Sequence, residues 1–315
     1  MDYQQLLDAV MSDVQAYRGQ GKVAAYIPAL AEADSRRFGI ALALGDGRTF
    51  TAGEAEAPFS IQSLSYVFTL SLALHHVKAA LWNHVGREPA GSPINSIVQL
   101  ELAQGKPRNP MTNAGAIVVT DQLIGRRSVD EAADELLAFL RDRCGDPSVA
   151  IDASHAMSES QAGAFNRSLA HFIGAFGNLV NDPETVLSLY FRQSSIEMSC
   201  VQLARAALYL AFDGNDPVTG DAVTTPSRAR RINSLMITSG HYDVSGDFAF
   251  RVGLPGKSAA NGAILTLVPG IGAVCVWSPG LNESQTSLAG TIALERLAER
   301  AGWSIFTGSR QALPA

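Results

Sequence analysis

A serine near the start of an apolar segment is placed where nucleophilic chemistry is favoured. The segment from Phe59 to Phe68 begins with small polar residues and continues as an apolar run. We expect Ser63 in the first turn of a helix, where free N–H groups and the helix dipole favour a developing alkoxide. Tyr66 lies three residues on, so it shares a face with Ser63 and can reach its hydroxyl. A serine nucleophile needs such a neighbour to take its proton, although a helix-capping serine is the alternative interpretation.

Four other segments hold more glycine and small polar residues than packing alone requires. These segments are 107–116, 190–197, 240–246 and 253–259. Asn113 precedes Ala-Gly, so it can either offer its amide to a polar ligand or form a turn. Lys257 follows Pro-Gly and is expected to open a strand after a turn. Tyr26, seen alone, would be a core residue.

The elements that must position these residues follow from hydrophobic periodicity. Helical spacing predicts a helix over 2–18, and two β-prone runs around Gly45-Asp-Gly predict a hairpin over 38–52. A helix is expected over 60–78, and mostly helical structure from 122 to about 214. The strands and last helix expected after Asn233 cover 246–253, 262–268, 272–278 and 287–300.

This order of elements predicts a single α+β domain of residues 1–315. Strands from both chain ends form a central antiparallel sheet, the sheet lobe, at about 1–60 and 230–315. An inserted helical lobe covers about 61–229, and the site is expected between the lobes. An all-parallel α/β fold is disfavoured because helices and strands do not alternate regularly.

Composition excludes several classes of protein. The chain has a formal charge of −6, which argues against a nucleic-acid partner. The first 17 residues hold three aspartates and no basic stretch before an apolar run, unlike a signal peptide, and no apolar run is long enough to span a membrane. Cys144, Cys200 and Cys275 are widely spaced, which predicts free thiols in a cytoplasmic protein. We expect no metal and no organic cofactor, because no histidines and carboxylates cluster at ligand spacing.

The same residues carry a resemblance to a known family. In order along the chain, they are Val23-Ala-Ala-Tyr-Ile-Pro, Ser60-Ile-Gln-Ser, Val85-Gly-Arg-Glu-Pro, Asn95-Ser, Gln99-Leu-Glu, Pro107-Arg-Asn-Pro, Asn113-Ala-Gly-Ala, Ser158-Glu, Phe176-Gly-Asn, Tyr190-Phe, Ser195-Ile-Glu, His241-Tyr-Asp and Trp277-Ser-Pro. The chain resembles the serine-dependent, bacterial-type glutaminases. The resemblance implies a β-lactamase/transpeptidase-like fold, a small-molecule substrate and a homo-oligomer.

The resemblance also implies a catalytic group. Ser63 would attack the side-chain amide carbon of L-glutamine, giving an acyl-enzyme and then L-glutamate and ammonia. Tyr26 and Tyr242 would lie beside Ser63 and assist proton transfer or hold the scissile amide. The backbone N–H of Ser63 is the expected oxyanion donor, with a second donor from the strand after Lys257.

A second implied group binds the substrate. Its members, besides Ser63 and Tyr242, are Asn113, Glu159, Asn166, Tyr190 and Ala260. A zwitterionic amino acid needs a carboxylate for its ammonium, and amide or hydroxyl donors for its carboxylate. Glu159 and Asn166 are seven residues apart, which would place them two turns apart on one helical face. The alternative for Glu159 is a solvated acid on a helix.

The chain departs from the family at several site positions. The family motif is Ser-x-x-Lys, and here Tyr66 stands in place of the lysine that accepts the serine proton. A phenol with a pKa near 10 replaces that lysine only if its pKa falls considerably. The other departures are Ala25 for an acid, Phe165 for an arginine, Ser194 for a cysteine and 257–263 for a glycine-rich stretch.

Three explanations of these departures stay open. The chain is a divergent glutaminase with another base, a glutaminase-fold protein with lost or altered activity, or a scaffold whose pocket was rebuilt. Under the second, it acts as another serine hydrolase or as a non-catalytic binder. Small residues at 259, 260 and 263, together with Phe165, would enlarge the pocket and favour a less polar ligand.

Overall fold

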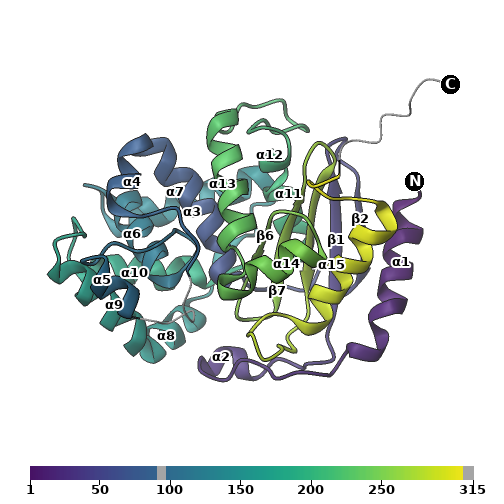
Figure 1. The fold of residues 1–315 in the computed structure, drawn as a ribbon, viewed down its shortest axis with the longest axis horizontal. Helices are drawn as coiled ribbons and strands as arrows, with labels where there is room; N and C mark the ends of the chain where they lie inside the picture. Colours follow the sequence, from purple (N-terminus) through teal and green to yellow (C-terminus); the bar gives the residue numbers. More distant parts are fainter. Residues whose placement is uncertain (91–96, 308–315) are drawn as a thin grey trace.

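A five-stranded sheet lies beside a group of helices in the computed structural model, which describes residues 1–90 and 97–307 (Figure 1). The strand order is β2-β1-β8-β7-β6, and each neighbouring pair is antiparallel. The strands are β1 (Gly39–Leu44), β2 (Thr49–Gly53), β6 (Gly256–Ser258), β7 (Ala263–Val268) and β8 (Gly272–Trp277). Strands from both ends of the chain therefore meet in one antiparallel sheet, which confirms the predicted fold class.

The middle of the sheet is covered on both faces. Strands β1, β7 and β8 are buried along their whole length, which explains their continuous apolar sequences. Helices α1 (Tyr3–Val14) and α15 (Leu288–Ala301) pack against each other on one side (Figure 1). Helices α11 (Cys200–Ala206) and α12 (Leu208–Ala211) contact the same strands and join the sheet to the helical lobe.

The helical lobe is built around two helices that are apolar on every side. Helix α3 (Ser65–His76) and helix α6 (Asn113–Ile124) are buried through most of their length and pack against each other. A helix that is apolar all round belongs in a core rather than on a surface. The surrounding helices are α4 (Leu81–His84), α5 (Val98–Leu102), α7 (Val129–Cys144), α8 (Ala153–Ala162), α9 (Ala164–Ala175) and α10 (Pro183–Ser194). Helix α2 (Pro28–Ala31) lies beside α8.

Two predicted elements were wrong. Residues 246–253 form no strand. Most of them belong to α14 (Ser245–Arg251), a helix that comes after α13 (Pro226–Ser239). The apparent alternation reflects one buried aromatic, Phe248, and one that is 90% exposed, Phe250. The predicted helix over 60–78 is also divided. It contains the end of β3 (Phe59–Ser60), a 3₁₀ turn (Gln62–Leu64) and then α3.

A second, three-stranded sheet supports that division. Strand β3 pairs with β5 (Ile196–Met198), which pairs with β4 (Ala150–Ile151). The backbone of Ile61 also bonds to Ile196. These bonds hold the chain extended just before the 3₁₀ turn. Asn95, one of the residues that carried the resemblance, lies outside the described residues.

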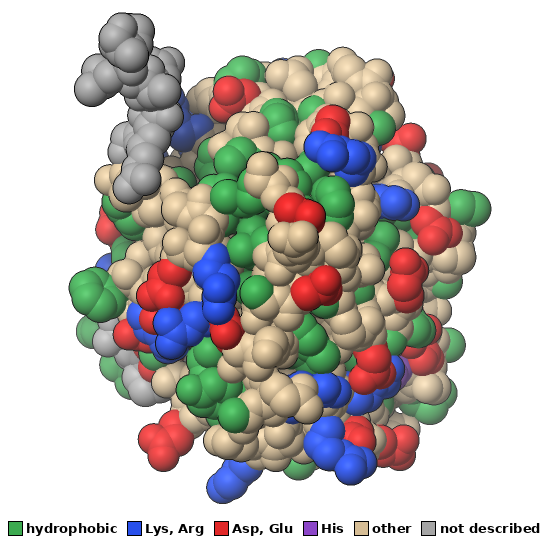
Figure 2. Space-filling view, turned by 90° about the vertical axis from the view of Figure 1, so that its right-hand side faces the viewer, with side chains coloured by type: hydrophobic (Ala, Val, Ile, Leu, Met, Phe, Trp, Pro, Cys, Tyr) green, Lys and Arg blue, Asp and Glu red, His purple; other side chains and the backbone are tan. Residues whose placement is uncertain are grey.

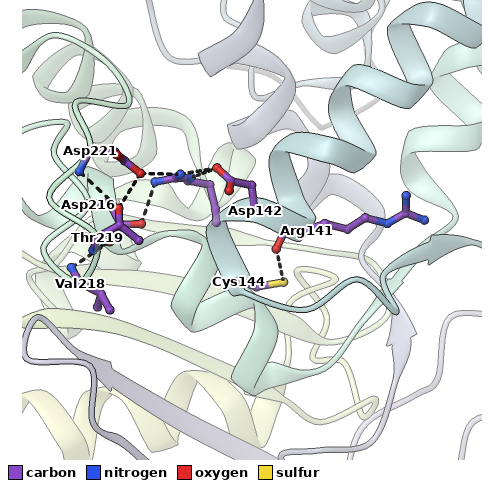
Figure 3. A network of polar contacts seen from close by, with 8 residues as sticks. Arg141, Asp142, Cys144, Asp216, Val218, Thr219 and Asp221 are labelled. Atoms are coloured by element: carbon purple, nitrogen blue, oxygen red, sulfur yellow. Dashed lines mark hydrogen bonds and ion pairs between the residues drawn. The ribbon is translucent and has the colours of Figure 1, made fainter.

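The last turn of α7 holds an ion cluster. Arg143 binds Asp142, Asp216 and Asp221, so it ties α7 to the loop before α13 (Figure 3). The side chains of Arg143 and Asp216 are both buried, and their atoms approach within 2.8 Å. A buried ion pair of this kind tolerates the loss of one partner poorly, because the other charge stays uncompensated.

Replacing Arg143 by leucine is therefore expected to lower the free energy of unfolding by about 3 kcal/mol. The exposed pair between Arg300 of α15 and Asp13 of α1 provides the matched control, and Arg300→Leu is expected to cost under about 1 kcal/mol. Urea unfolding followed by circular dichroism compares the two variants. Equal losses in both would contradict a special role for the buried pair.

The face beside α1 and α15 carries interspersed charges. Figure 2 shows Lys and Arg side chains close to Asp and Glu side chains, with apolar side chains between them. Several of these charges are paired, as Arg251 is with Glu295 and Arg300 with Asp13. Within the described ranges, no helix is both long and apolar enough to cross a membrane.

Candidate active site

Ser63 lies in the 3₁₀ turn between β3 and α3, one turn earlier than a simple helix start. Its neighbour Gln62 has a φ of +49°, a conformation that a residue with a side chain seldom adopts. Such strain persists only where surrounding contacts enforce it, and it gathers at functional sites. Ser63 is 8% exposed, so its hydroxyl is largely shielded from solvent. The strained turn, and not only a helix N-terminus, sets the direction of this serine.

Tyr242 is the side chain that binds the Ser63 hydroxyl. The phenol donates to Ser63 Oγ over 2.9 Å. Tyr242 lies in a turn after α13 and also has a positive φ, +56°. Burial raises the pKa of this phenol to about 12, and the bond to Ser63 partly opposes that rise. Two strained residues, Gln62 and Tyr242, therefore flank the one hydrogen bond made to the serine side chain among the described residues.

Tyr66 lies beside this pair but has other partners. Its hydroxyl shares a 2.6 Å hydrogen bond with Tyr190 and donates to Asn113 Oδ1 over 3.2 Å. Asn113 in turn donates to Asn166 Oδ1 over 3.1 Å. Burial, with a further contribution from Tyr242, raises the pKa of the Tyr66 phenol well above 10. Neither buried phenol, Tyr66 nor Tyr242, thus meets in the resting structure the chemical requirement for replacing lysine, which is a lowered pKa.

Glu159 and Asn166 do not share a helix, so the expected face was wrong. Helix α8 ends at Ala162 and α9 begins at Ala164, with Gly163 between them. A Cβ at Gly163 would lie 2.4 Å from the Phe191 ring, so this close approach needs glycine. Both side chains nevertheless line the same cavity. The interruption of the helix at Gly163 therefore lets Glu159 of α8 and Asn166 of α9 reach one cavity from two separate helices.

Glu159 is buried and has an oxygen without a partner. The residue is 4% exposed, and Oε1 has no hydrogen-bond partner among the described residues. Burial raises the pKa of this carboxyl to about 7, while Gln62 and the charge of His155 oppose the rise. An unpartnered carboxylate oxygen in a cavity is suited to a cation. This geometry excludes the alternative of a solvated helix acid.

One cavity of about 340 Å³ gathers all the predicted site residues. The lining includes Tyr26, Ser63, Tyr66, Asn113, Glu159, Phe165, Asn166, Tyr190, Tyr242 and Ala260. Tyr26 is 62% exposed, so it is not the core residue that its sequence context predicts. Within the described chain the lining contains one carboxylate and no lysine or arginine.

Asn261 is a site residue that sequence reasoning missed. Its Nδ2 donates to Ser60 O over 2.7 Å, its Oδ1 accepts from Ala263 N, and its carbonyl accepts from Trp277 Nε1. These bonds tie the loop after β6 to the strand that leads into Ser63. The sequence signal was its place in the stretch that departs from the family's glycines.

The loop after β6 and the 3₁₀ turn each bring one backbone N–H group to the cavity. Ser63 and Ala260 both line it, and their amides have no hydrogen-bond partner within residues 1–90 and 97–307. Free amides of this kind can stabilise an oxyanion. The arrangement fits the oxyanion donors expected from the sequence.

Three side chains that the sequence does not place together lie near one another outside the cavity. Ligand atoms of Asp152, His155 and Glu197 fall within 4.8 Å, a spacing that a metal ion can use. Asp152 caps α8 and binds His155 Nδ1 at 2.9 Å, which accounts for two of the three. Burial is partial at all three, and they stand apart from Ser63.

A serine directed into a cavity between an antiparallel sheet and a helical lobe defines the β-lactamase-like class of folds. The family model for glutaminases matches residues 21–306. The chain therefore belongs to the glutaminase family, whose members are hydrolases that act on carbon–nitrogen bonds.

Individual relatives agree along the whole chain. It is 53% identical over 305 residues to a glutaminase from Rhizobium rhizogenes, covering 97% of this chain and 99% of the other. A thermolabile glutaminase from Rhizobium etli gives the same identity and the same coverage of both chains. The structure of a probable glutaminase, ybaS, superposes with a TM-score of 0.91 at 34% identity, covering 97% of this chain and 98% of the other.

Proposed function

We propose that the protein hydrolyses L-glutamine to L-glutamate and ammonia through an acyl-enzyme on Ser63. The observation that carries this proposal is the 2.9 Å bond between Tyr242 and Ser63, in a cavity that also holds the unpartnered carboxylate of Glu159. The bond places the Tyr242 oxygen next to the Ser63 hydroxyl, where the ionised phenol can accept the serine proton, and the carboxylate supplies a site for an ammonium group. Membership of the glutaminase family supports the same reaction.

The chemical steps use groups already described. The Ser63 oxygen bonds to the side-chain amide carbon of glutamine while its proton passes to the Tyr242 oxygen, which must first lose its own proton, because the neutral phenol is the donor in the resting bond and burial raises its pKa to about 12. The amide N–H groups of Ser63 and Ala260 hold the oxyanion. Tyr242 then gives its proton to the departing nitrogen, the C–N bond breaks, and ammonia leaves. Water then attacks the resulting ester while its proton passes to the Tyr242 oxygen, the ester C–O bond breaks, glutamate leaves, and Tyr242 returns the proton to the Ser63 oxygen.

Binding of the amino-acid end is assigned to the far side of the cavity. Glu159 pairs with the ammonium group, while the amides of Asn113 and Asn166 and the Tyr190 hydroxyl bind the carboxylate. Asn113 donates directly to Asn166, and the Tyr66 hydroxyl links Asn113 to Tyr190. Tyr26, which lines the cavity and is partly exposed, is assigned to positioning the scissile amide.

The direct experiment measures ammonia and glutamate together. Purified protein should release the two products in equal amounts from L-glutamine, and more slowly from L-asparagine, whose amide is one methylene shorter. Equal rates on both amides, or glutamine binding without release of ammonia, would contradict the proposal.

The ionisation of Glu159 predicts a pH dependence of binding. Its pKa, raised to about 7 by burial, lies above the ordinary value of 4.5, so the folded free protein holds a proton there below pH 7. Affinity for L-glutamate should therefore fall as pH drops below 7, by roughly tenfold per unit. Calorimetry on a Ser63→Ala protein measures this without turnover. A Glu159→Gln control should bind weakly with a flat profile; a flat profile in the parent would contradict the assignment.

Tyr66 separates the proposed function from its alternative, a glutaminase fold with altered activity. We expect Tyr66→Lys to raise kcat on glutamine by tenfold or more, because an amine there regains the base of the Ser-x-x-Lys motif. Lys257 Nζ lies only 5.6 Å from the ring of Tyr66, so two amines would share the space and one would stay neutral. Steady-state kinetics at pH 7 provide the measurement.

The matched control for this substitution is Tyr66→Phe, which removes the hydroxyl but keeps the ring. It should change kcat by less than threefold if Tyr66 is not the base. A Tyr66→Lys protein that is no faster than its parent favours the altered-activity alternative. In that case the loss of glutaminase activity has its cause elsewhere in the pocket. Hydrolysis of ester substrates then tests whether the protein is another serine hydrolase.

We further propose a single domain, since one cluster of buried residues includes Ala41 and Leu265 of the sheet with Leu64 and Ile117 of the helices. One cooperative unfolding transition is the expected result. The protein is also proposed to act in the cytoplasm, in keeping with its free thiols, and to form a homo-oligomer, which the resemblance implies. Light scattering measures the mass of the particle in solution and therefore the number of chains in it.

A further inference from the structure

Lys257 is a buried charged residue that the proposed mechanism does not use. It lies on β6, is 0% exposed, and donates to the carbonyls of Gly240 over 3.2 Å and Ser258 over 2.6 Å. No carboxylate pairs with it among the described residues. Burying an ammonium without a counter-ion is costly, so a fold retains it where the charge has a use.

The ammonium of Lys257 lies against the ring of the residue that binds Ser63. Its Nζ is 4.2 Å from the ring centroid of Tyr242, and 5.6 Å from that of Tyr66. A cation at this distance from an aromatic face is attracted to the ring, more strongly where water is excluded. The attraction grows when the phenol loses its proton, because the ring then carries a full negative charge.

Lys257 also fixes the backbone that leads to Tyr242. Gly240 stands two residues earlier, and its carbonyl accepts from Lys257 Nζ and from Ser258 N at 3.1 Å. A Cβ at Gly240 would lie 1.8 Å from Gly256 O, so the turn presses directly on β6. These contacts help to hold the backbone of Tyr242 in its strained conformation with a positive φ.

We propose that Lys257 is a positioning residue for Tyr242. Its ammonium holds the ring and the preceding carbonyl where the phenol reaches Ser63, and its charge favours the phenolate that takes the serine proton. No proton leaves Lys257 in this role: the proton of Ser63 moves to the Tyr242 oxygen, and Lys257 balances the charge beforehand. The inference rests on the proposed function of Ser63.

Few other charges act on this group. Among the described residues, the titratable side chains that the structure places near Lys257 are Tyr242, Tyr66 and His241, and none of them is a carboxylic acid. Burial, together with Lys257 itself, lowers the pKa of His241 well below 6.5, so that ring is neutral. Burial also lowers the pKa of Lys257 well below 10.5. The charge favouring the phenolate is present below that lowered pKa and is lost as pH rises through it.

Two substitutions divide the role into its parts. Lys257→Met removes both the charge and the bond to Gly240, whereas Lys257→Gln removes the charge but keeps a donor. Lys106→Met is the matched control, because Lys106 also donates to a carbonyl, Trp82 O at 2.8 Å, but it lacks the contact with the Tyr242 ring that Lys257 makes. Full ammonia-release profiles from pH 5 to 10 are measured for all three.

We expect both Lys257 variants to lose tenfold to a hundredfold in kcat with KM changed less than threefold. The rising limb of their pH profile should move at least one unit to higher pH, which a purely structural role would not cause. Lys106→Met should match the parent. If Lys257→Met does not fold, Lys257→Gln decides: a parent-like kcat and profile in that protein would overturn the inference.

A double-mutant cycle tests whether Lys257 acts through Tyr242. In a Tyr242→Phe background, Lys257→Gln should have little further effect on kcat; an undiminished effect would overturn the inference. If the parent releases no ammonia, the proposed function fails by itself. The rate at which a fluorophosphonate labels Ser63, followed by mass, then judges Lys257. Slower labelling of Lys257→Gln supports the inference, and equal labelling overturns it.

Discussion

Ser63→Ala is expected to lower kcat for L-glutamine by roughly a thousandfold or more, because the acyl-enzyme cannot form without the hydroxyl. The side chain is small and its one hydrogen bond among the described residues is to Tyr242, so the fold should be unaffected. Affinity for glutamine should change little, since Glu159 and the amides stay in place. Ammonia release and calorimetry on the same preparation measure both quantities.

A neighbouring serine provides the control for this change. Ser65 lies two residues on and donates to Gln62 O over 2.7 Å within the same turn. Ser65→Ala should therefore retain measurable turnover and lose some stability. Turnover in Ser63→Ala that equals the parent's would remove Ser63 from the mechanism.

Tyr242→Phe carries the second large effect. The phenol is the group that contacts Ser63 Oγ, so its loss should lower kcat by roughly a hundredfold or more, in the range of a lost general base. The apolar part of the side chain is preserved, so KM should stay within threefold. The pH profile should also lose the limb that reports ionisation of the phenol.

Tyr209→Phe is the matched control, because that phenol is also buried and also binds a serine, Ser71, at 2.5 Å, but does not line the cavity. Its expected effect is on stability alone. If Tyr242→Phe kept the parent's kcat and pH profile, the proton would have to pass to another group, and Tyr66 would be the first to examine.

The local fold was largely predictable where sequence patterns are strong. The Gly-Asp-Gly hairpin and the apolar strands at β7 and β8 appear within one or two residues of their expected limits. The α+β class followed from the order of elements, whereas the β-lactamase-like type and the substrate-binding roles of Asn113, Tyr190 and Ala260 came from the resemblance. The cavity gathers them, although their roles stay proposals until measured.

The misses have physical causes. A helical α14 was hidden because Phe250 is exposed, so an apolar residue at a surface position imitated strand alternation. The break at Gly163 depends on the Phe191 ring, a contact distant in sequence. Asn261 has no motif of its own, since its value comes from three bonds to separate strands and loops.

The lysine composition also acquires a different meaning. No lysine stands three residues after Ser63. Lys257, on β6, nevertheless contacts the ring of Tyr242, the residue that binds Ser63. Spacing along the chain could not show this, because β6 and α3 are brought together only by the sheet and the turn after α13.

The break between α8 and α9 has a consequence for how this site changes over generations. Because the proposed ammonium anchor and the proposed carboxylate donor belong to separate helices, each can be altered while the other keeps its place. Phe165 precedes Asn166 on α9 and also lines the cavity, whereas Glu159 belongs to α8. Substrate preference can therefore drift through α9 alone, one mutational step at a time, with recognition of the amino group inherited intact.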